Sequence, residues 1–225
     1  PYFYDEYYIN SVDVNDNLSG RSDYVDIHNL HYGMNLVSFS VLPEDNSVGN
    51  VISSDNINQI IGEGVAASLL PNGQWVGSLE LIQPDEGYWI SADGQTVETI
   101  VGSKFYNTGY NLNYGANLIS YTCSNSGLLS ELIDNNLVNS VIGEGVAASR
   151  LPNGQWVGSL EQLSTGKGYW FLTDDETFLN YDCPEESVVA FRAEELVEDD
   201  RFVQSTQQAF YFFEDIEGVE IGDKV

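Results

Sequence analysis

Short runs of apolar, β-branched and aromatic residues alternate along this chain with clusters of Gly, Asn, Asp and Ser. Residues 35–42 and residues 117–123 are two such runs, and each is of strand length and follows a glycine. β-Branched and aromatic residues pack well on the pleated surface of a sheet, so runs of this composition are typical of strands. The two segments therefore predict the opening strands of two β-rich units.

A short helix is predicted after each opening strand. Residues 126–133 begin with Ser126, an N-cap candidate, and carry apolar residues at helical spacing. The counterpart at residues 47–53 has a weaker pattern and contains a glycine. Each unit is therefore expected to combine several strands with one short helix.

A hairpin is predicted further along each unit. Residues 57–70 and 138–151 are rich in apolar and small residues, and a Gly-Glu-Gly sequence interrupts each of them, which predicts a bulge or a close backbone approach within a strand. Pro-Asn-Gly-Gln follows at residues 71–74 and 152–155, and its Asn-Gly dipeptide favours tight hairpin turns with positive φ. We expect the return strand directly after this turn, and in the first unit a last strand at residues 87–91.

The most informative feature of the sequence is an internal duplication. Residues 61–80 recur as residues 142–161 with a single change, from Leu69 to Arg150. Identity over this length does not arise by chance, and self-similarity at a fixed period indicates tandem structural repeats. The match extends to two flanking pairs of segments: residues 32–39 with 114–121, an offset of 82, and residues 87–89 with 168–170, an offset of 81.

Each copy contains the same motifs in the same order: Gly-x-Asn-Leu-(Ile/Val)-Ser, a predicted short helix, Asn-Gly-x-Trp-x-Gly-Ser-Leu and Gly-Tyr-Trp. This order resembles a tandem repeat of very large, modular extracellular proteins of marine bacteria and of the appendage or tail-associated proteins of their phages. The resemblance covers residues 30–101 and 112–181 and implies an extracellular structural role. Members of that family commonly have Gly-Trp-Asn in the opening strand, where this chain has Met34 and Ala116 in place of Trp.

The predicted fold is mainly β, with two tandem homologous small β-rich domains, each with one short helix, plus flanking strands. Residues 202–213 have the composition of the first strand of a further β-module, and a lone strand would have to pair with a neighbouring sheet or another subunit. Because the chain starts with Pro1 rather than Met, we expect it to be a piece of a longer protein. The predicted segments are an N-terminal extension at 1–29, repeat 1 at 30–105, repeat 2 at 106–182, an acidic linker at 183–200, and an incomplete β-module or assembly segment at 201–225.

The charge balance narrows the classes of partner. The 225 residues include 35 acidic and 7 basic ones, which gives a formal net charge of −28. Binding to nucleic acid needs clustered Lys and Arg, which this sequence lacks, and an anionic membrane surface is disfavoured for the same reason. No apolar run approaches the ~20 residues of a membrane span, so membrane insertion is not expected. Such acidity favours solubility in a medium where salt or divalent cations screen self-repulsion.

Two cysteines, Cys123 and Cys183, have neither Cys-x-x-Cys spacing nor neighbouring histidines, so they do not predict a zinc site. A disulfide between them would link the start of repeat 2 to its end and close a loop of about 60 residues, worth roughly 4 kcal/mol. The alternative is two free buried thiols. The disulfide is favoured because the other features indicate an oxidising compartment.

Four duplicated acids raise the question of a glycosidase, in which two carboxyl groups cooperate. Active sites are seldom built twice in tandem units, whereas a fold needs its turn and hydrogen-bonding residues in every copy. We therefore assign no catalytic residue and expect no enzyme activity. The acids concerned are Glu63, Glu80, Glu144 and Glu161.

Aromatic residues form the second candidate site. An aromatic ring suits the apolar face of a sugar, so these side chains are candidates for glycan stacking. The alternative is that they belong to the core. Successive residues of a strand point to opposite faces, so at least one residue of each Tyr-Trp pair should pack inward. The candidates are Tyr88, Trp89, Tyr169 and Trp170, accompanied by Trp75 and Trp156.

Oxygen ligands at alternating positions make Asp13, Asn15 and Asn17 a candidate calcium loop, although the loop motif's glycine and bidentate acid are missing. A solvated turn is the alternative. His28 and His31 have no soft ligands near them in sequence and are expected to be strand or surface residues. Apart from Ca²⁺, no cofactor is predicted.

These features together predict a non-enzymatic structural or assembly module of an extracellular, cell-surface or virion appendage, such as a spacer, decoration or fibre subunit. Its expected partners are other copies of itself or neighbouring structural subunits, and surface glycans are a further candidate. Two alternatives stay open: a carbohydrate-binding adhesin domain, and an accessory part of a secreted hydrolase. Glycan binding that is lost on substituting Trp89 and Trp170 would favour the adhesin, and activity on a polysaccharide would favour the hydrolase.

Overall fold

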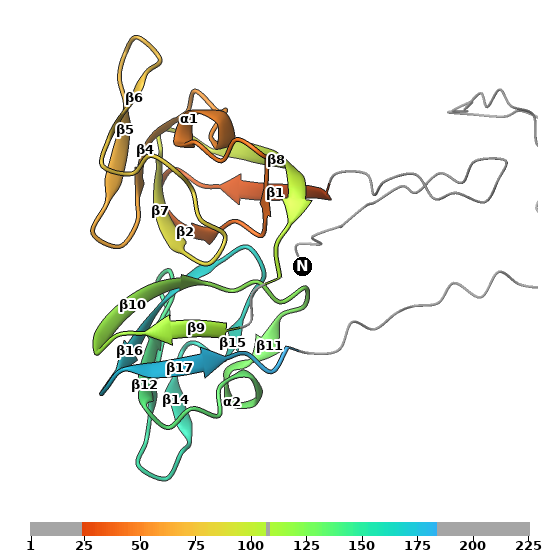
Figure 1. Ribbon diagram of the computed structural model, residues 1–225. Coiled ribbons are helices and arrows are strands. Elements are labelled where there is room, and N and C mark those ends of the chain that lie inside the picture. Colours follow the sequence, from red (N-terminus) through yellow and green to blue (C-terminus); the bar gives the residue numbers. More distant parts are fainter. Residues whose placement is uncertain (1–23, 107–108, 184–225) are drawn as a thin grey trace, which may run out of the picture. The chain divides into compact units, whose positions relative to one another are not determined.

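The computed structural model describes residues 24–106 and 109–183, and within them the protein is mainly β with two short helices (Figure 1). This confirms the predicted fold class. The strands pair antiparallel throughout, and they are grouped in two sets, one for each copy of the duplicated sequence. The N-terminal extension up to Asp23, the predicted acidic linker from residue 184 onward and the last segment lie outside the described residues.

Repeat 1 contains a five-stranded sheet and a three-stranded sheet, with one helix between β3 and β4 in the chain. The helix is α1 (Val48–Val51). The larger sheet has the order β2 (Gly33–Ser38), β7 (Gly87–Ala92), β4 (Ile57–Ile61), β5 (Ala66–Leu69) and β6 (Trp75–Gly77). The smaller sheet has the order β1 (Tyr24–Leu30), β8 (Thr96–Lys104) and β3 (Val41–Leu42).

Repeat 2 reproduces the five-stranded sheet and divides the remaining strands into two pairs. Its helix is α2 (Leu129–Leu132). The sheet has the order β10 (Gly115–Ser120), β16 (Gly168–Thr173), β12 (Val138–Ile142), β13 (Ala147–Arg150) and β14 (Trp156–Gly158). The pairs are β9 (Gly109–Leu112) with β17 (Thr177–Asn180), and β11 (Gly127–Leu128) with β15 (Gln162–Leu163).

Each repeat has its own hydrophobic core, and the Gly-Tyr-Trp strand lies inside each large sheet, between β2 and β4 in repeat 1 and between β10 and β12 in repeat 2. Tyr88 is fully buried, and its hydroxyl accepts a hydrogen bond from the backbone N–H of Gln83 at 2.8 Å. Tyr169 is buried in the same way and accepts one from the backbone N–H of Ser164 at 2.8 Å. A buried hydroxyl needs such a partner, so each tyrosine joins the core to the loop that precedes its own strand.

The Gly-Glu-Gly sequences were predicted to interrupt a strand as a bulge or a close backbone approach. In the structure they form hairpin turns instead. In repeat 1 the chain reverses between β4 and β5, with the Gly62 N–H donating to the Val65 carbonyl at 2.9 Å and with Gly64 at φ +73°. The bulge lies earlier, between Ile57 and Gln59, where the register of β4 against β7 shifts. Glycine twice in three residues is compatible with either structure, so the composition alone did not decide between them.

The predicted Asn-Gly hairpins are confirmed in both repeats. Gly73 lies at φ +81° between β5 and β6, where its N–H donates to the carbonyl of Leu70, and Gly154 takes the same position in repeat 2. At the end of the return strand, glycine is required because the neighbouring backbone approaches closely. A Cβ on Gly77 would lie 2.1 Å from the Ala66 carbonyl oxygen, so no larger residue fits against the neighbouring strand.

Both predicted helices are present: α1 begins directly after Ser47, as predicted, whereas α2 begins later than expected. Ser126 does not cap α2; Leu128 precedes the helix, and no side-chain hydrogen bond caps it. Instead, the Leu129 N–H donates to the backbone carbonyl of Glu161 at 3.0 Å, and in repeat 1 Val48 donates to Glu80 in the same way. The first helical N–H is therefore satisfied by the returning hairpin rather than by a serine side chain.

The opening strands are shorter than predicted, and repeat 1 starts earlier. Residues 35–42 divide into β2 and β3, which belong to different sheets, because the chain bends after Ser38. A continuous apolar run does not reveal that the chain passes from one sheet to another, since the residues are buried in both sheets. β1 begins at Tyr24 and pairs with β8, so this repeat includes residues before the predicted boundary at residue 30.

Candidate functional site

The two repeats are joined by a pair of reciprocal carboxylate contacts. Glu63, in the Gly-Glu-Gly turn of repeat 1, accepts a hydrogen bond from the Leu118 backbone N–H of repeat 2 at 2.7 Å. Glu144, in the same turn of repeat 2, accepts one from the Leu36 backbone N–H of repeat 1 at 2.9 Å. Glu63 and Glu144 are equivalent positions in the duplication, and so are Leu36 and Leu118. Each copy therefore binds the other with the same residues.

Backbone contacts repeat the same reciprocity. The Ser38 N–H donates to the Gly166 carbonyl at 3.1 Å, and the equivalent Ser120 N–H donates to the Asp85 carbonyl at 3.2 Å. Isolated β-bridges join Val37 to Lys167 and Ile119 to Glu86. In these contacts each copy uses the same two surface segments, and each segment meets the partner segment of the other copy. This is the pattern of a two-fold, isologous interface.

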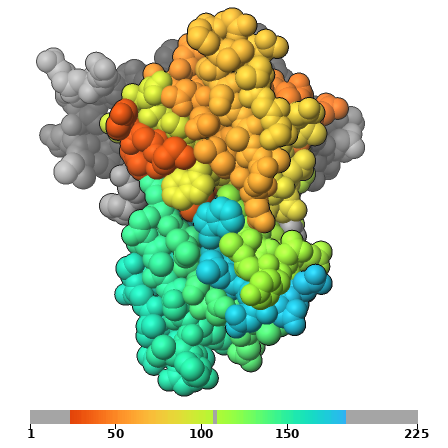
Figure 2. Space-filling model, turned by 90° about the vertical axis from the view of Figure 1, so that its left-hand side faces the viewer, coloured from red at the N-terminus to blue at the C-terminus, as the bar shows by residue number. Residues whose placement is uncertain are grey.

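The glycine of Gly-Tyr-Trp belongs to this junction. A Cβ on Gly168 would lie 2.7 Å from the Val37 carbonyl oxygen and 3.2 Å from the Leu36 side chain. A Cβ on Gly87 would lie 2.8 Å from the Leu118 side chain. Leu36 and Leu118 are almost fully buried and belong to neither repeat's core cluster, so they pack at the junction. In Figure 2 the yellow atoms of repeat 1 and the blue atoms of repeat 2 lie against each other in the middle of the face shown.

The two halves of the junction carry different charges. Glu144 contacts His31, whose Nε2 is 2.5 Å from its Oε1, and Lys167, whose Nζ is 3.9 Å from its Oε2. The positions equivalent to His31 and Lys167 are Asn113 and Glu86, so no cation occupies them beside Glu63. The hydrogen bond to Glu144 raises the pKa of His31 above its ordinary value, with the Tyr32 carbonyl adding to the shift.

This asymmetry predicts a pH dependence. The folded-state pKa of His31 is raised, so its contact with Glu144 contributes fully to the stability of the folded protein below the ordinary histidine pKa. This contribution is lost as the pH rises through the raised pKa. His31 is largely exposed, so we expect less than about 1 kcal/mol. His31→Asn supplies the residue that repeat 2 already has at Asn113. Urea midpoints measured between about pH 5.5 and 8.5 should fall more for the wild type than for His31→Asn, and parallel curves would contradict the prediction.

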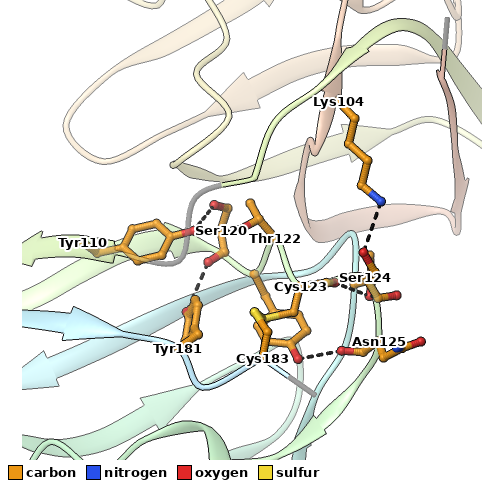
Figure 3. Close-up of a disulfide and its surroundings, with 11 residues drawn as sticks. Lys104, Tyr110, Ser120, Thr122, Cys123, Ser124, Asn125, Tyr181 and Cys183 are labelled. Atoms are coloured by element: carbon orange, nitrogen blue, oxygen red, sulfur yellow. Dashed lines mark hydrogen bonds between the residues drawn. A yellow bond between two sulfur atoms is a disulfide. The ribbon is translucent and has the colours of Figure 1, made fainter. Parts of the chain in front are cut away.

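Repeat 2 contains the disulfide between Cys123 and Cys183, with Cα atoms 5.5 Å apart (Figure 3). Cys123 is buried in the repeat 2 core. The tyrosines around it are also tied to the backbone: the Tyr121 hydroxyl donates to the Asn125 carbonyl and the Tyr181 hydroxyl to the Ser120 carbonyl. Burial raises the pKa of both tyrosines, which therefore remain neutral donors at ordinary pH.

The same place in repeat 1 is closed by strand pairing instead. With the offsets of 82 and 81, Cys123 corresponds to Val41 and Cys183 to Gly102. Val41 and Leu42 form β3, which pairs with the end of β8. A Cβ on Gly102 would lie 2.1 Å from the Leu42 carbonyl oxygen, so the backbones approach closely there. The disulfide in repeat 2 and the β3–β8 pairing in repeat 1 thus perform the same closure.

The aromatic candidates separate by face. Tyr88 and Tyr169 are core residues, so neither offers a ring face to a sugar. Trp89 and Trp170 are half-buried on the other face of the same strands. This agrees with the strand alternation, in which one residue of each pair packs inward.

Two grooves occupy equivalent places in the repeats. The first, of about 720 Å³, lies between α1 and the β5–β6 hairpin and is lined by Trp75. The second, of about 570 Å³, lies between α2 and the β13–β14 hairpin and is lined by Trp156. Both tryptophans are half-buried and pack against the core of their own repeat. These positions were part of the wider aromatic set, but the sequence did not indicate that a groove lies beside each.

A third cavity, of about 620 Å³, lies on repeat 2 beside the junction and contains both Glu144 and Glu161. Glu144 is already hydrogen-bonded through both oxygens, to His31 and to the Leu36 N–H. In this arrangement Glu144 serves as an acceptor for groups of the protein itself. Of the four duplicated acids, Glu63 and Glu144 therefore have a structural use at the junction.

The histidines are held by protein groups. His28 is buried in β1, and its Nε2 lies 3.3 Å from the Asp26 carboxylate; the hydrogen bonds to this carboxylate come from Ser40. Burial acts to raise the pKa of Asp26, but His28 and the Ser40 donors hold it below its ordinary value. Among residues 24–106 and 109–183 there is no group of three or more His, Cys, Asp or Glu that could hold a metal ion. The candidate calcium loop at residues 13–17 lies outside the described residues.

Comparisons with known proteins give no further identification: no family model, curated protein or solved structure matches the chain. Among the described residues, no helix combines the length and the apolar character needed to cross a membrane. The function must therefore be inferred from the junction and the grooves themselves.

Proposed function

We propose that this chain is a non-enzymatic structural module of an extracellular or virion-surface appendage, in which the paired repeats form a stiff spacer. The observation that carries the proposal is the reciprocal contact of Glu63 with Leu118 and of Glu144 with Leu36. The residues that recur verbatim in the duplication are used to join the two copies. Such a use requires no substrate, and it explains why both copies keep the same acid.

Two further features support an extracellular location. The Cys123–Cys183 disulfide persists in oxidising compartments and is rare in the cytosol. A net charge of −28 keeps a surface protein soluble and suppresses non-specific contacts, provided that salt screens its self-repulsion. The partners would be neighbouring structural subunits or further copies of the chain.

The hydrolase alternative is less well supported by this geometry. Glu80 and Glu161 are exposed and lie in separate repeats, and Glu63 and Glu144 are engaged at the junction. A glycosidase needs two carboxyl groups facing one sugar from within about 10 Å, with one of them free to donate a proton. No such pair is needed to explain why these acids recur.

The location can be tested in the organism or virus preparation from which the sequence derives. An antibody raised against residues 24–183 should label the surface of intact cells or particles and should sediment with them. Alkylation before lysis should leave Cys123 and Cys183 unmodified, because both are in the disulfide. Recovery of the chain in the reduced, cytosolic fraction with both thiols alkylated would refute the proposal.

A further inference from the structure

The structure gives each repeat a groove whose hairpin wall is built largely from identical residues. In repeat 1 this wall includes Trp75, Val76, Gly77 and Glu80. In repeat 2 it includes the equivalent residues Trp156, Val157, Gly158 and Glu161. The opposite wall differs, because Val48 and Gly49 of α1 are replaced by Leu129 and Ser130 of α2.

The need to pack the core does not explain why all of these wall residues are identical in the two repeats. Val76 is 41% exposed and Val157 42% exposed, and Glu80 and Glu161 are exposed as well. An exposed position next to the block has diverged: Leu81, which is 47% exposed, corresponds to Gln162. Surface substitutions away from special features usually change stability by less than about 0.5 kcal/mol, so the fold tolerates changes there. The unchanged exposed residues point to a common ligand.

We propose that each groove binds a neutral or amino-sugar carbohydrate, with Trp75 and Trp156 as the stacking surfaces. Each tryptophan packs against its own core and lines the groove, which is how an aromatic platform is held rigid for a sugar. Glu80 and Glu161 provide acceptors for sugar hydroxyls at the same wall. This binding goes beyond the proposed structural role and does not depend on it.

The charge of the grooves selects among carbohydrates. Of the described residues that line the two grooves, none is Lys or Arg, whereas both grooves contain a glutamate and the first also contains Asp55. Sulfated or uronate-rich polymers would meet these carboxylates and the net charge of −28, and Arg150, which lies against Trp156 at the second groove, already donates to the backbone carbonyls of Asn135 and Gly154. Neutral sugars avoid that repulsion, and an amino group would be attracted.

The single change within the duplicated block distinguishes the two grooves. Leu69 lines the first groove, whereas its counterpart Arg150 places its guanidinium 5.8 Å from the centre of the Trp156 ring. Arg150 also donates to the backbone carbonyls of Asn135 and Gly154, so it is fixed in that position. The second groove is also smaller, at about 570 Å³ compared with about 720 Å³ for the first. Groove 1 should therefore bind sugar more tightly than groove 2.

The test is a titration of the full ¹⁵N-labelled chain, followed through the indole N–H signals of its four tryptophans. Tetramers of N-acetylglucosamine and of glucose serve as probes up to about 10 mM, and a heparin-derived tetrasaccharide serves as the polyanionic control. With at least one neutral probe, the Trp75 signal should shift in a saturable manner, the Trp156 signal should respond more weakly, and heparin should leave both unchanged. The signals are assigned with single Trp→Phe variants.

Substitution at the exposed valines provides matched controls that leave the core intact. Val76→Arg should weaken binding at Trp75 by about tenfold and leave Trp156 unaffected, and Val157→Arg should do the reverse. Arg150→Leu should bring the affinity of groove 2 up to that of groove 1. Four results would overturn the proposal: no saturable indole shift with either neutral probe, shifts only at Trp89 and Trp170, shifts insensitive to Val76→Arg and Val157→Arg, or shifts that follow protein concentration without sugar, which would indicate self-association.

Discussion

Removing the disulfide should lower the free energy of unfolding of repeat 2 by about 4 kcal/mol, measured by urea denaturation of the Cys123→Ala/Cys183→Ala variant. The bond closes a loop with a sequence separation of 60, so its loss restores considerable freedom to the unfolded chain. Alanine is preferred to serine because Cys123 is buried in the core, where a hydroxyl would need a partner. The native fold should persist, since the core strands are unchanged.

Repeat 1 provides the internal control for this prediction, because β3–β8 pairing takes the place of the disulfide there. Hydrogen exchange should show the loss of protection concentrated in β9, β16 and β17, with a smaller effect in β1, β7 and β8 transmitted through the junction. A loss below about 1 kcal/mol, or an equal loss of protection in both repeats, would show that the disulfide is not what closes repeat 2.

The double variant Glu63→Ala/Glu144→Ala should destabilise the joined repeats by about 3 kcal/mol. Each carboxylate is the acceptor for a leucine N–H at the junction, and hydrogen bonds to charged groups are worth about 1.5–3 kcal/mol when buried. Glu63 is exposed and Glu144 is 27% exposed. Because water competes for an exposed carboxylate, we expect the hydrogen bond of Glu63 to contribute an energy in the lower half of this range. Urea denaturation gives the energy, and ¹⁵N relaxation should show the repeats tumbling more independently.

Glu80→Ala/Glu161→Ala is the matched control, since it removes the same number of acids from the same duplicated block. These glutamates are exposed and contribute only their backbone carbonyls to the described fold, as acceptors for α1 and α2. The control should therefore change the free energy of unfolding by less than about 0.5 kcal/mol. If the two double variants were equally stable and tumbled alike, the reciprocal carboxylates would not hold the junction, and the stiff-spacer function would lose its support.

Local chemistry explains which predictions succeeded. The Asn-Gly turns were predictable because a positive φ is set by the residue itself, as Gly73 and Gly154 show. The alternation of Tyr88 inward and Trp89 outward follows from strand geometry. The Gly-Glu-Gly turn and the cap of α2 were predicted wrongly, because glycines suit both a bulge and a turn and because a backbone carbonyl from another element replaced the serine cap.

By itself, the sequence determined that there are two β-rich copies, where their tight turns lie and which cysteines are available for pairing, since these depend on residue type and on neighbours a few positions away. Only the tertiary structure decided what the duplicated acids do. Glu63 meets a backbone N–H 55 residues away and Glu144 one 108 residues away, and such contacts depend on how two finished sheets pack. The same holds for the grooves, whose walls come from a helix and a hairpin that meet only after folding.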